Sequence, residues 1–163
     1  MVKIDTLFNE KKISRISELE LGRYVNFFES SYKDNLEHSK KNILEFPRWS
    51  IISGYYAMHD ITKLFIAKKF RIKIDFEVHA TTIKLLRELI KHNEIITLFE
   101  KGYKEFLSLA NDLEEARRDR SKVQYYTGTK FLIEEYKKRA SEFYEKIVLA
   151  YLGKIKELFE EAD

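Results

Sequence analysis

The chain has 163 residues, of which 44% are hydrophobic and 35% charged, a length and composition that fit one folded domain and exclude a disordered chain. Thirty basic side chains nearly balance 27 acidic ones, so the net charge is only +3 and any site for a polyanion has to be local. The absence of Cys excludes a disulfide framework and a Cys-ligated metal, and it fits a reducing, cytoplasmic location.

One Pro and five Gly leave few helix breakers, which favours an all-α protein. The N-terminal residues do not have the apolar run of a signal peptide, and no segment approaches the roughly 20 apolar residues of a membrane span, so we expect no membrane partner. Abundant Lys and Glu without Cys resembles the composition of thermophile proteins. We expect one domain over residues 1–163, with a short N-terminal segment (1–16) before a helical bundle (17–163).

The first long helix is predicted over residues 17–46. Ser17 and Glu20 have the spacing of a capping box, and Ile16 and Leu21 that of a hydrophobic staple. Apolar residues then follow one helical face up to the residue before Pro47.

The second helix begins at Pro47 and reads WSIISGYYAMHDITKLFIAKKF, apolar on most of its circumference, as expected of a central helix surrounded by others. It ends in a basic cluster, Lys68, Lys69, Arg71 and Lys73, which predicts a solvated helix end or, less often, a contact with phosphates. A short third helix follows from Val78, and KHNE predicts a turn.

The fourth helix has an apolar seam in steps of four and three, formed by Phe99, Tyr103, Phe106, Ala110 and Leu113. A last helix after YYTGT would be roughly 45 Å long at 1.5 Å per residue, long enough for one end to project or to pair with another chain. The elements predict an up-down bundle of four main helices with an additional short helix.

The stretch ARRDRSKVQYYTG continues the seam of the fourth helix with polar residues, since the same rhythm reaches Arg117, Arg120 and Gln124. An unpaired guanidinium is costly to bury, so these side chains must face a partner, a crevice or solvent. One interpretation is that the arginines only complement the negative end of the helix dipole. The other is an anion site, in which guanidinium groups bind phosphate and tyrosines stack on nucleobases.

The four histidines, His38, His59, His79 and His92, have no metal-ligand spacing, and we expect neither a metal nor another cofactor. His59 lies on the crowded central helix and is expected to be a hydrogen-bonded core residue. His79 opens the third helix, where it is a cap, a surface residue or a member of a site. The chain also lacks a Gly-rich phosphate loop and a nucleophile elbow.

In their order along the chain, SGYYAMHDITKLFIAKKF, VHATTIKLL and ARRDRSKVQYY resemble the HEPN domain, in particular its small free-standing prokaryotic members. Those members have a Tyr-Tyr-Ala segment with a nearby His, a His that opens the next helix, and later an Arg followed by His or by Asp-Tyr. The resemblance covers roughly residues 17–150. It matches the Tyr pair to Tyr55 and Tyr56, and the helix-opening His to His79.

The resemblance implies an all-α bundle that forms a homodimer, with the motif arginines of two chains near a shared cleft. Many relatives are metal-independent endoribonucleases of toxin-antitoxin, defence or RNA-processing systems, often beside a minimal nucleotidyltransferase. Matched to this chain, the motif Arg is Arg120, followed by Ser121, and the motif His is replaced by Tyr125. The implied site therefore has Arg120, Tyr125 and His79 in catalytic positions; the predicted substrate-binding residues are Arg117, Ser121, Gln124 and Tyr126.

The replacement of His by Tyr125 weakens the nuclease interpretation, because a Tyr with a pKa near 10 is a poor base at neutral pH. The leading hypothesis is a HEPN-like domain that binds RNA or a nucleotide around Arg120, with or without endoribonuclease activity. The alternative is a non-catalytic dimeric interaction module that pairs with a nucleotidyltransferase partner, and a weaker one is a structural helical dimer.

Overall fold

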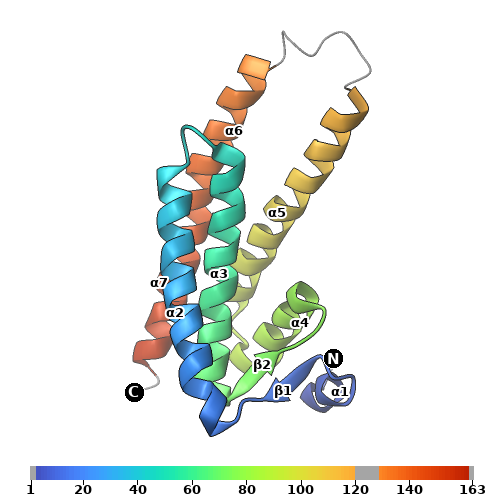
Figure 1. The fold of residues 1–163 in the computed structure, drawn as a ribbon, viewed down its shortest axis with the longest axis vertical. Coiled ribbons are helices and arrows are strands. Elements are labelled where there is room, and N and C mark those ends of the chain that lie inside the picture. Colours follow the sequence, from blue (N-terminus) through green and yellow to red (C-terminus); the bar gives the residue numbers. More distant parts are fainter. Residues whose placement is uncertain (1–2, 120–128, 162–163) are drawn as a thin grey trace.

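The computed structural model describes the backbone of residues 3–119 and 129–161, and it describes their side chains except for residues 110, 112–119 and 129–132. These residues form an up-down bundle with a small sheet at one end (Figure 1), which confirms the predicted all-α class. The long helices are α2 (Glu18–Lys41), α3 (Pro47–Phe70), α5 (Asn93–Asp119), and a rod of α6 (Thr129–Phe143), a π-helical turn (Tyr144–Val148) and α7 (Leu149–Glu160). The short elements are α1 (Ile4–Asn9), β1 (Ile13–Arg15), β2 (Ile72–Ile74), α4 (Val78–Leu85) and a π-helical turn (Leu86–Ile90).

The helix α2 begins as the sequence predicts and ends earlier. Ser17 is the N-cap, and its capping box with Glu20 is formed in both directions. The prediction that this helix runs to Phe46 is wrong, because α2 ends at Lys41. There Asn42 caps the helix, and its side-chain amide donates to the carbonyl oxygen of His38 at 2.8 Å. A turn then leads to Pro47, which occupies the first turn of α3 as predicted.

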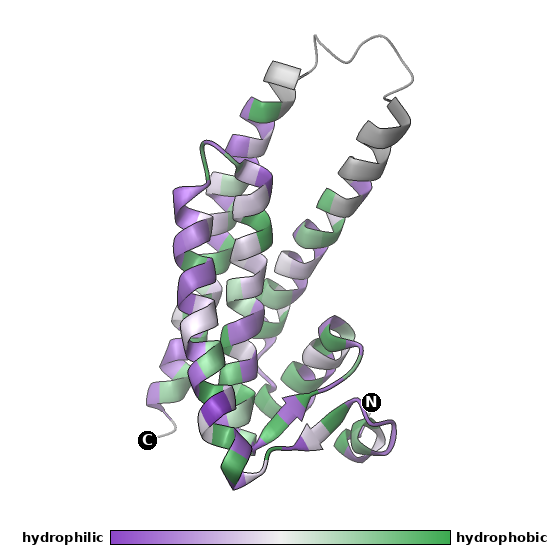
Figure 2. Ribbon diagram, viewed as in Figure 1, coloured by the Kyte–Doolittle hydropathy of each residue, from purple (hydrophilic) through white to green (hydrophobic). Residues whose placement is uncertain are grey.

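The helix α3 is the buried centre of the bundle, with α2, α5 and the α6–α7 rod packed around it. In Figure 2 the visible face of α2 is largely hydrophilic, as expected of a helix at the surface. The main core contains the predicted apolar faces of α2, α5 and the rod as far as their side chains are described. Representative members are Tyr32, Phe99, Phe143 and Tyr151.

A two-stranded antiparallel sheet was not predicted. Ile13 of β1 pairs with Ile74 of β2, and Arg15 pairs with Ile72. The alternation of buried Ile72 and Ile74 with the more accessible Lys73 is the period-two pattern of a half-buried strand. The sheet covers a second, smaller core with Leu7 of α1 and residues of α3 and α4, so the predicted basic link is a strand fixed against the N-terminal segment.

The ends of α5 and α6 extend beyond the turn between α2 and α3 (Figure 1). At 1.5 Å per residue the α6–α7 rod is about 48 Å long, and the part that projects is its beginning. Nearer the bundle, Arg139 of α6 donates from Nε and Nη2 to Glu105 of α5, at 3.0 and 2.8 Å. Within the described part of the chain, every helix is too short or too polar to cross a membrane.

Candidate functional site

Aromatic and imidazole side chains meet where α3, α4 and α5 pack together. The Tyr55 hydroxyl and Nδ1 of His79 are 2.6 Å apart. The ring of His79 stacks on Tyr103 with the centroids 5.2 Å apart and the planes 13° apart, and Tyr55 stacks on Phe106 at 4.8 Å and 24°. We call these four residues the Tyr55–His79 cluster.

Tyr55 and His79 differ in their exposure to solvent. Tyr55 is fully buried, whereas His79 at the first turn of α4 is half-buried. Among the described residues only Tyr55 forms a hydrogen bond with His79, and that bond uses Nδ1. The other ring nitrogen of His79, Nε2, is therefore free to bind a ligand or water.

His59 lies one turn of α3 after Tyr55 and confirms the expectation of a core histidine. Its side chain is 2% exposed, and its Nε2 is 3.2 Å from Oγ1 of Thr82. Its Nδ1 is buried and has no hydrogen-bond partner among the described residues. The rings of His59 and His79 are 5.3 Å apart, so protonating both would place two positive charges close together in a poorly solvated region.

Burial lowers the pKa of both imidazoles, and the positive charge of Lys63 lowers it further in each case. Burial also lowers the pKa of Lys63, whose ammonium group lies 4.9 Å from the ring centroid of Phe28. Burial raises the pKa of the Tyr55 hydroxyl, with smaller contributions in the same direction from neighbouring tyrosines. At neutral pH His79 and its neighbour His59 are therefore neutral, and the Tyr55 phenol keeps its hydrogen.

Asp60 supplies a nearly buried carboxylate next to this region. Its Oδ2 accepts hydrogen bonds from Oγ of Ser31 at 2.6 Å and Nδ2 of Asn35 at 3.0 Å. Burial raises the pKa of Asp60, while those two bonds and Lys63 oppose the increase. The Asp60 carboxylate on α3 is thus held by two side chains of α2, through one of its two oxygens.

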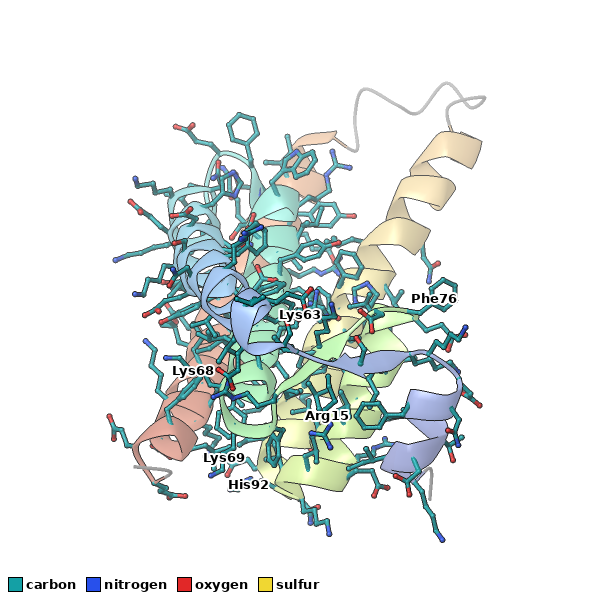
Figure 3. All side chains as sticks on the ribbon, turned by 60° about the horizontal axis from the view of Figure 1, so that its bottom comes forward. Arg15, Lys63, Lys68, Lys69, Phe76 and His92 are labelled. Carbon is teal, nitrogen blue, oxygen red and sulfur yellow. The ribbon has the colours of Figure 1, made fainter. Side chains whose placement is uncertain are left out.

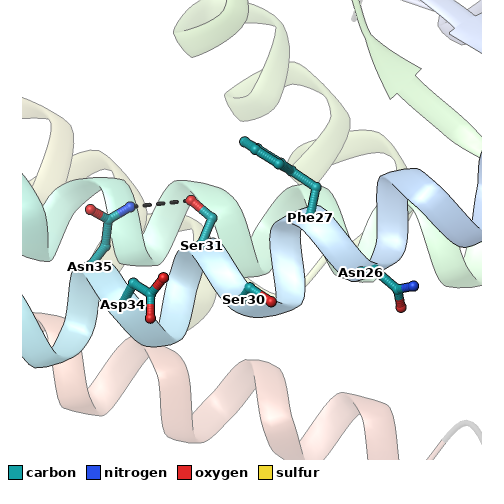
Figure 4. Close-up of a pocket in the computed structure, with 6 residues that line it drawn as sticks. All are labelled: Asn26, Phe27, Ser30, Ser31, Asp34 and Asn35. Carbon is teal, nitrogen blue, oxygen red and sulfur yellow. Dashed lines mark hydrogen bonds between the residues drawn. The ribbon is translucent and has the colours of Figure 1, made fainter.

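Ser31 and Asn35 also line a shallow groove on α2 with a volume of about 480 Å³ (Figure 4). The groove is lined by Asn26, Phe27, Ser30, Ser31, Asp34 and Asn35. All six residues come from a single helix, and the Tyr55–His79 cluster is not among them. The groove therefore carries no argument for a catalytic site.

Two of the four basic residues at and after the end of α3 form ion pairs. Lys68 and Lys69 are exposed at the C-terminal end of α3, away from Lys63 (Figure 3). Arg71 forms an ion pair with Glu18 at 3.1 Å, and Lys73 forms one with Glu20 at 3.1 Å. The first turn of α2 therefore neutralises half of the predicted basic cluster, which favours its interpretation as a helix end over a phosphate site.

Most of the predicted site residues lie outside the described residues. These are Arg120, Ser121, Gln124, Tyr125 and Tyr126, and whether they lie near His79 stays untested. Arg117 is on α5, roughly 16 Å along the helix axis from Phe106 at 1.5 Å per residue. In one chain, His79, which contacts the middle of α5 at Tyr103 and Phe106, and the Arg117 backbone near the end of that helix are thus separate positions.

Four residues of this region were not predicted to belong to the candidate site: Tyr103, Phe106, Lys63 and Asp60. The spacing of Tyr55, His59 and Lys63, one turn apart on α3, is visible in the sequence and indicates a shared helix face. No sequence signal reveals that the seam of α5 crosses that face at Tyr103. Among the described residues, no group of three or more His, Cys, Asp or Glu side chains is placed to hold a metal ion.

Comparisons of the chain with protein-family models, with curated proteins and with solved structures found no match.

Proposed function

We propose that this protein is a HEPN-like helical domain that binds RNA or a nucleotide at the arginine-bearing end of α5, around Arg120. The observation that supports the proposal is the length of α5, which continues to Asp119 and extends beyond the turn between α2 and α3 (Figure 1). The backbone positions of Arg117 and Arg118 therefore lie past the main body of the bundle, where a large ligand has access to them.

The chemistry of this stretch suits a phosphate ligand. Guanidinium groups donate paired hydrogen bonds to phosphate oxygens, and four basic residues over 117–122 are offset only by Asp119. The C-terminal end of a helix carries partial negative charge, which adds to the preference for cations there by about 0.3–1 kcal/mol. The dipole accounts for one arginine at a helix end, and a local excess of several supports a polyanionic ligand better.

Endoribonuclease activity at this end of α5 would need a proton acceptor other than His79 of the same chain. The separation along α5 keeps the Tyr55–His79 cluster and the Arg117 region apart, and Tyr125 is a weak base. In a homodimer a second copy could complete the cleft, as the HEPN resemblance implies. We therefore propose RNA or nucleotide binding as the primary function and treat cleavage as an additional activity to be measured.

Fluorescence anisotropy with labelled single-stranded and hairpin RNA tests the proposal. Arg120→Ala should weaken binding, and the affinity should fall steeply as salt rises because phosphate contacts release counterions. Lys101→Ala is the matched control, because Lys101 is an exposed cation in the first half of the same helix, sixteen residues before Arg117. It should leave the affinity unchanged.

The same samples, incubated with RNA in EDTA, test for metal-independent cleavage. Cleavage that Arg120→Ala abolishes would establish the nuclease activity, and cleavage that persists in this variant would refute the site. If the protein binds no RNA even at low salt, RNA binding is refuted and the interaction module with a nucleotidyltransferase partner becomes the better hypothesis.

A further inference from the structure

The hydroxyl hydrogen of Tyr55 determines which nitrogen of His79 is protonated. Tyr55 is fully buried, and among the described residues its hydroxyl has one partner, Nδ1 of His79 at 2.6 Å. Burial raises the pKa of Tyr55, so the phenol keeps its hydrogen at neutral pH. If His79 donated from Nδ1, the buried hydroxyl hydrogen would have no acceptor, which is strongly disfavoured. The hydroxyl therefore donates and Nδ1 accepts.

A neutral imidazole that accepts at Nδ1 carries its hydrogen on Nε2. His79 is then a hydrogen-bond donor at the nitrogen that has no described protein partner. Taking up a second proton would place an N–H on Nδ1, facing the Tyr55 hydroxyl. The Tyr55 bond thus opposes protonation, in addition to the burial that already lowers the pKa of His79.

The same count of hydrogens applies to His59. Thr82 has one hydroxyl hydrogen, which it donates to the carbonyl oxygen of Val78 at 2.7 Å. At its contact with His59 the Thr82 oxygen must therefore accept, and His59 donates from Nε2. The N–H of His59 is therefore used within the core, in its bond to Thr82. Of the two described histidines where α3, α4 and α5 meet, only His79 has an N–H that is not used in a hydrogen bond to a described residue.

The groups around His79 do not favour a cationic ring. From α3 it faces Tyr55, His59 and the positive charge of Lys63, and from α5 it faces Tyr103 and Phe106. No ion pair joins His79 to any carboxylate in the described part of the chain. A base that must accept and keep a proton during a reaction needs such support, whereas a neutral donor does not.

We propose that Tyr55 is a positioning residue that fixes His79 as a neutral Nε2–H donor, and that His79 presents this donor to a phosphate or carbonyl oxygen of a bound RNA chain, which extends to it from the arginine-bearing end of α5, and does not act as a base. RNA as the ligand rests on the proposed function; the protonation of His79 does not. Tyr103, which is partly exposed beside His79, is an aromatic side chain that a nucleobase of the same ligand can contact.

Long-range ¹H–¹⁵N NMR of the ¹⁵N-labelled protein at neutral pH reads the protonated nitrogen of each histidine directly. The His79 signals are assigned by their absence in His79→Gln. We expect the Nε2–H form in the unmodified protein and a mixture of both forms in Tyr55→Phe. Tyr56→Phe is the matched control, because the neighbouring Tyr56 is exposed and has no hydrogen bond to His79. A hydrogen on Nδ1, or a Tyr55→Phe spectrum identical to that of the unmodified protein, would overturn the proposal.

The role toward the ligand is tested with a single-stranded RNA oligonucleotide, after circular dichroism has shown that the variants fold. His79→Gln keeps an amide donor and cannot take up a proton, whereas His79→Leu has no donor. We expect Gln to retain the affinity and Leu to lose about three- to tenfold, the value of one hydrogen bond. Equal losses in both variants, or cleavage abolished in Gln with binding intact, would overturn the donor role. If the unmodified protein binds no RNA, the proposed function and the RNA ligand are refuted, and the NMR result still decides the role of Tyr55.

Discussion

Substituting Gly54 by Ala tests how closely α3 packs against its neighbours. A Cβ atom built at Gly54 would lie 2.9 Å from Cγ2 of Val148, 3.0 Å from Oγ of Ser39 and 3.1 Å from Cε1 of Phe143. All three distances are shorter than an ordinary van der Waals contact, and the three neighbours belong to different parts of the bundle. Gly54 therefore stands where α2 and the α6–α7 rod approach α3 together.

One of these neighbours, Ser39, cannot move aside easily. Ser39 donates to the carbonyl oxygen of Ser50 at 2.8 Å, and Ser50 donates back to the carbonyl oxygen of Ser39 at 2.6 Å, so both side chains are fixed. Overpacking of this kind costs about 1–3 kcal/mol, and the better helix propensity of Ala offsets about 1 kcal/mol of it. We expect Gly54→Ala to lower the free energy of unfolding by up to about 2 kcal/mol after that offset.

Urea unfolding followed by circular dichroism measures the effect, with Gly22→Ala and Gly153→Ala as controls. Both control glycines lie in helices and are exposed, and no atom lies within 4 Å of a Cβ built there. Each control should therefore raise the free energy of unfolding by about 0.5–1 kcal/mol. Equal stabilisation by all three substitutions would refute the close approach of the helices at Gly54.

Other substitutions and conditions test the buried polar groups and the assembly. Thr62→Val removes the acceptor of the buried Tyr151 hydroxyl, 2.5 Å away, and should cost about 1–3 kcal/mol in urea unfolding; Tyr151→Phe should cost less because it leaves no buried donor unpaired. The free energy of unfolding should fall as the pH drops below 6.5, by at most about 1.4 kcal/mol per pH unit for each of His59 and His79, because their pKa values are lowered only in the folded state and the unfolded chain then binds more protons. Burial raises the pKa of Asp60 in the folded state, so this carboxyl adds stability as the pH falls from that raised pKa to 3.8 and opposes the effect of the histidines. The variant Asp60→Asn removes this contribution. A gain in stability of that variant on going from pH 7 to 6 would contradict the buried neutral histidines. Light scattering at micromolar concentration should give twice the chain mass of 19.6 kDa if the predicted homodimer forms, and a monomer would count against it.

The long helices could be predicted because their signals are local. The capping box at Ser17 and the Pro at position 47 each act within one turn, and both are formed as expected. The apolar stripes are repeated over many turns, so a single exception does not hide them. The end of α2 was misplaced because apolar residues continue past Asn42, and the sequence pattern does not show that this side chain closes the helix.

The small sheet was missed for a different reason. Each strand has three residues, too few for a period-two pattern to stand out, and the partners Ile13 and Ile74 are far apart in the sequence. Burial of Ile72 and Ile74 against Leu7 depends on a contact that no local propensity encodes. Short strands whose pairing partners are distant in the sequence are therefore the part of this fold that is hardest to predict from the sequence.

The candidate site shows the same limit at the level of single atoms. His79 was recognised because it opens a helix, and Tyr55 because it belongs to a Tyr pair, but their hydrogen bond depends on how α3 is rotated. Gly54 and Tyr55 are adjacent and point about 100° apart around the helix, so the close packing at Gly54 also fixes the direction of the Tyr55 hydroxyl. The contact of α3 with α2 and the rod thereby sets the protonation of an imidazole on α4. A prediction of what His79 does consequently needs the packing of the whole bundle, and no motif that contains His79 alone supplies it.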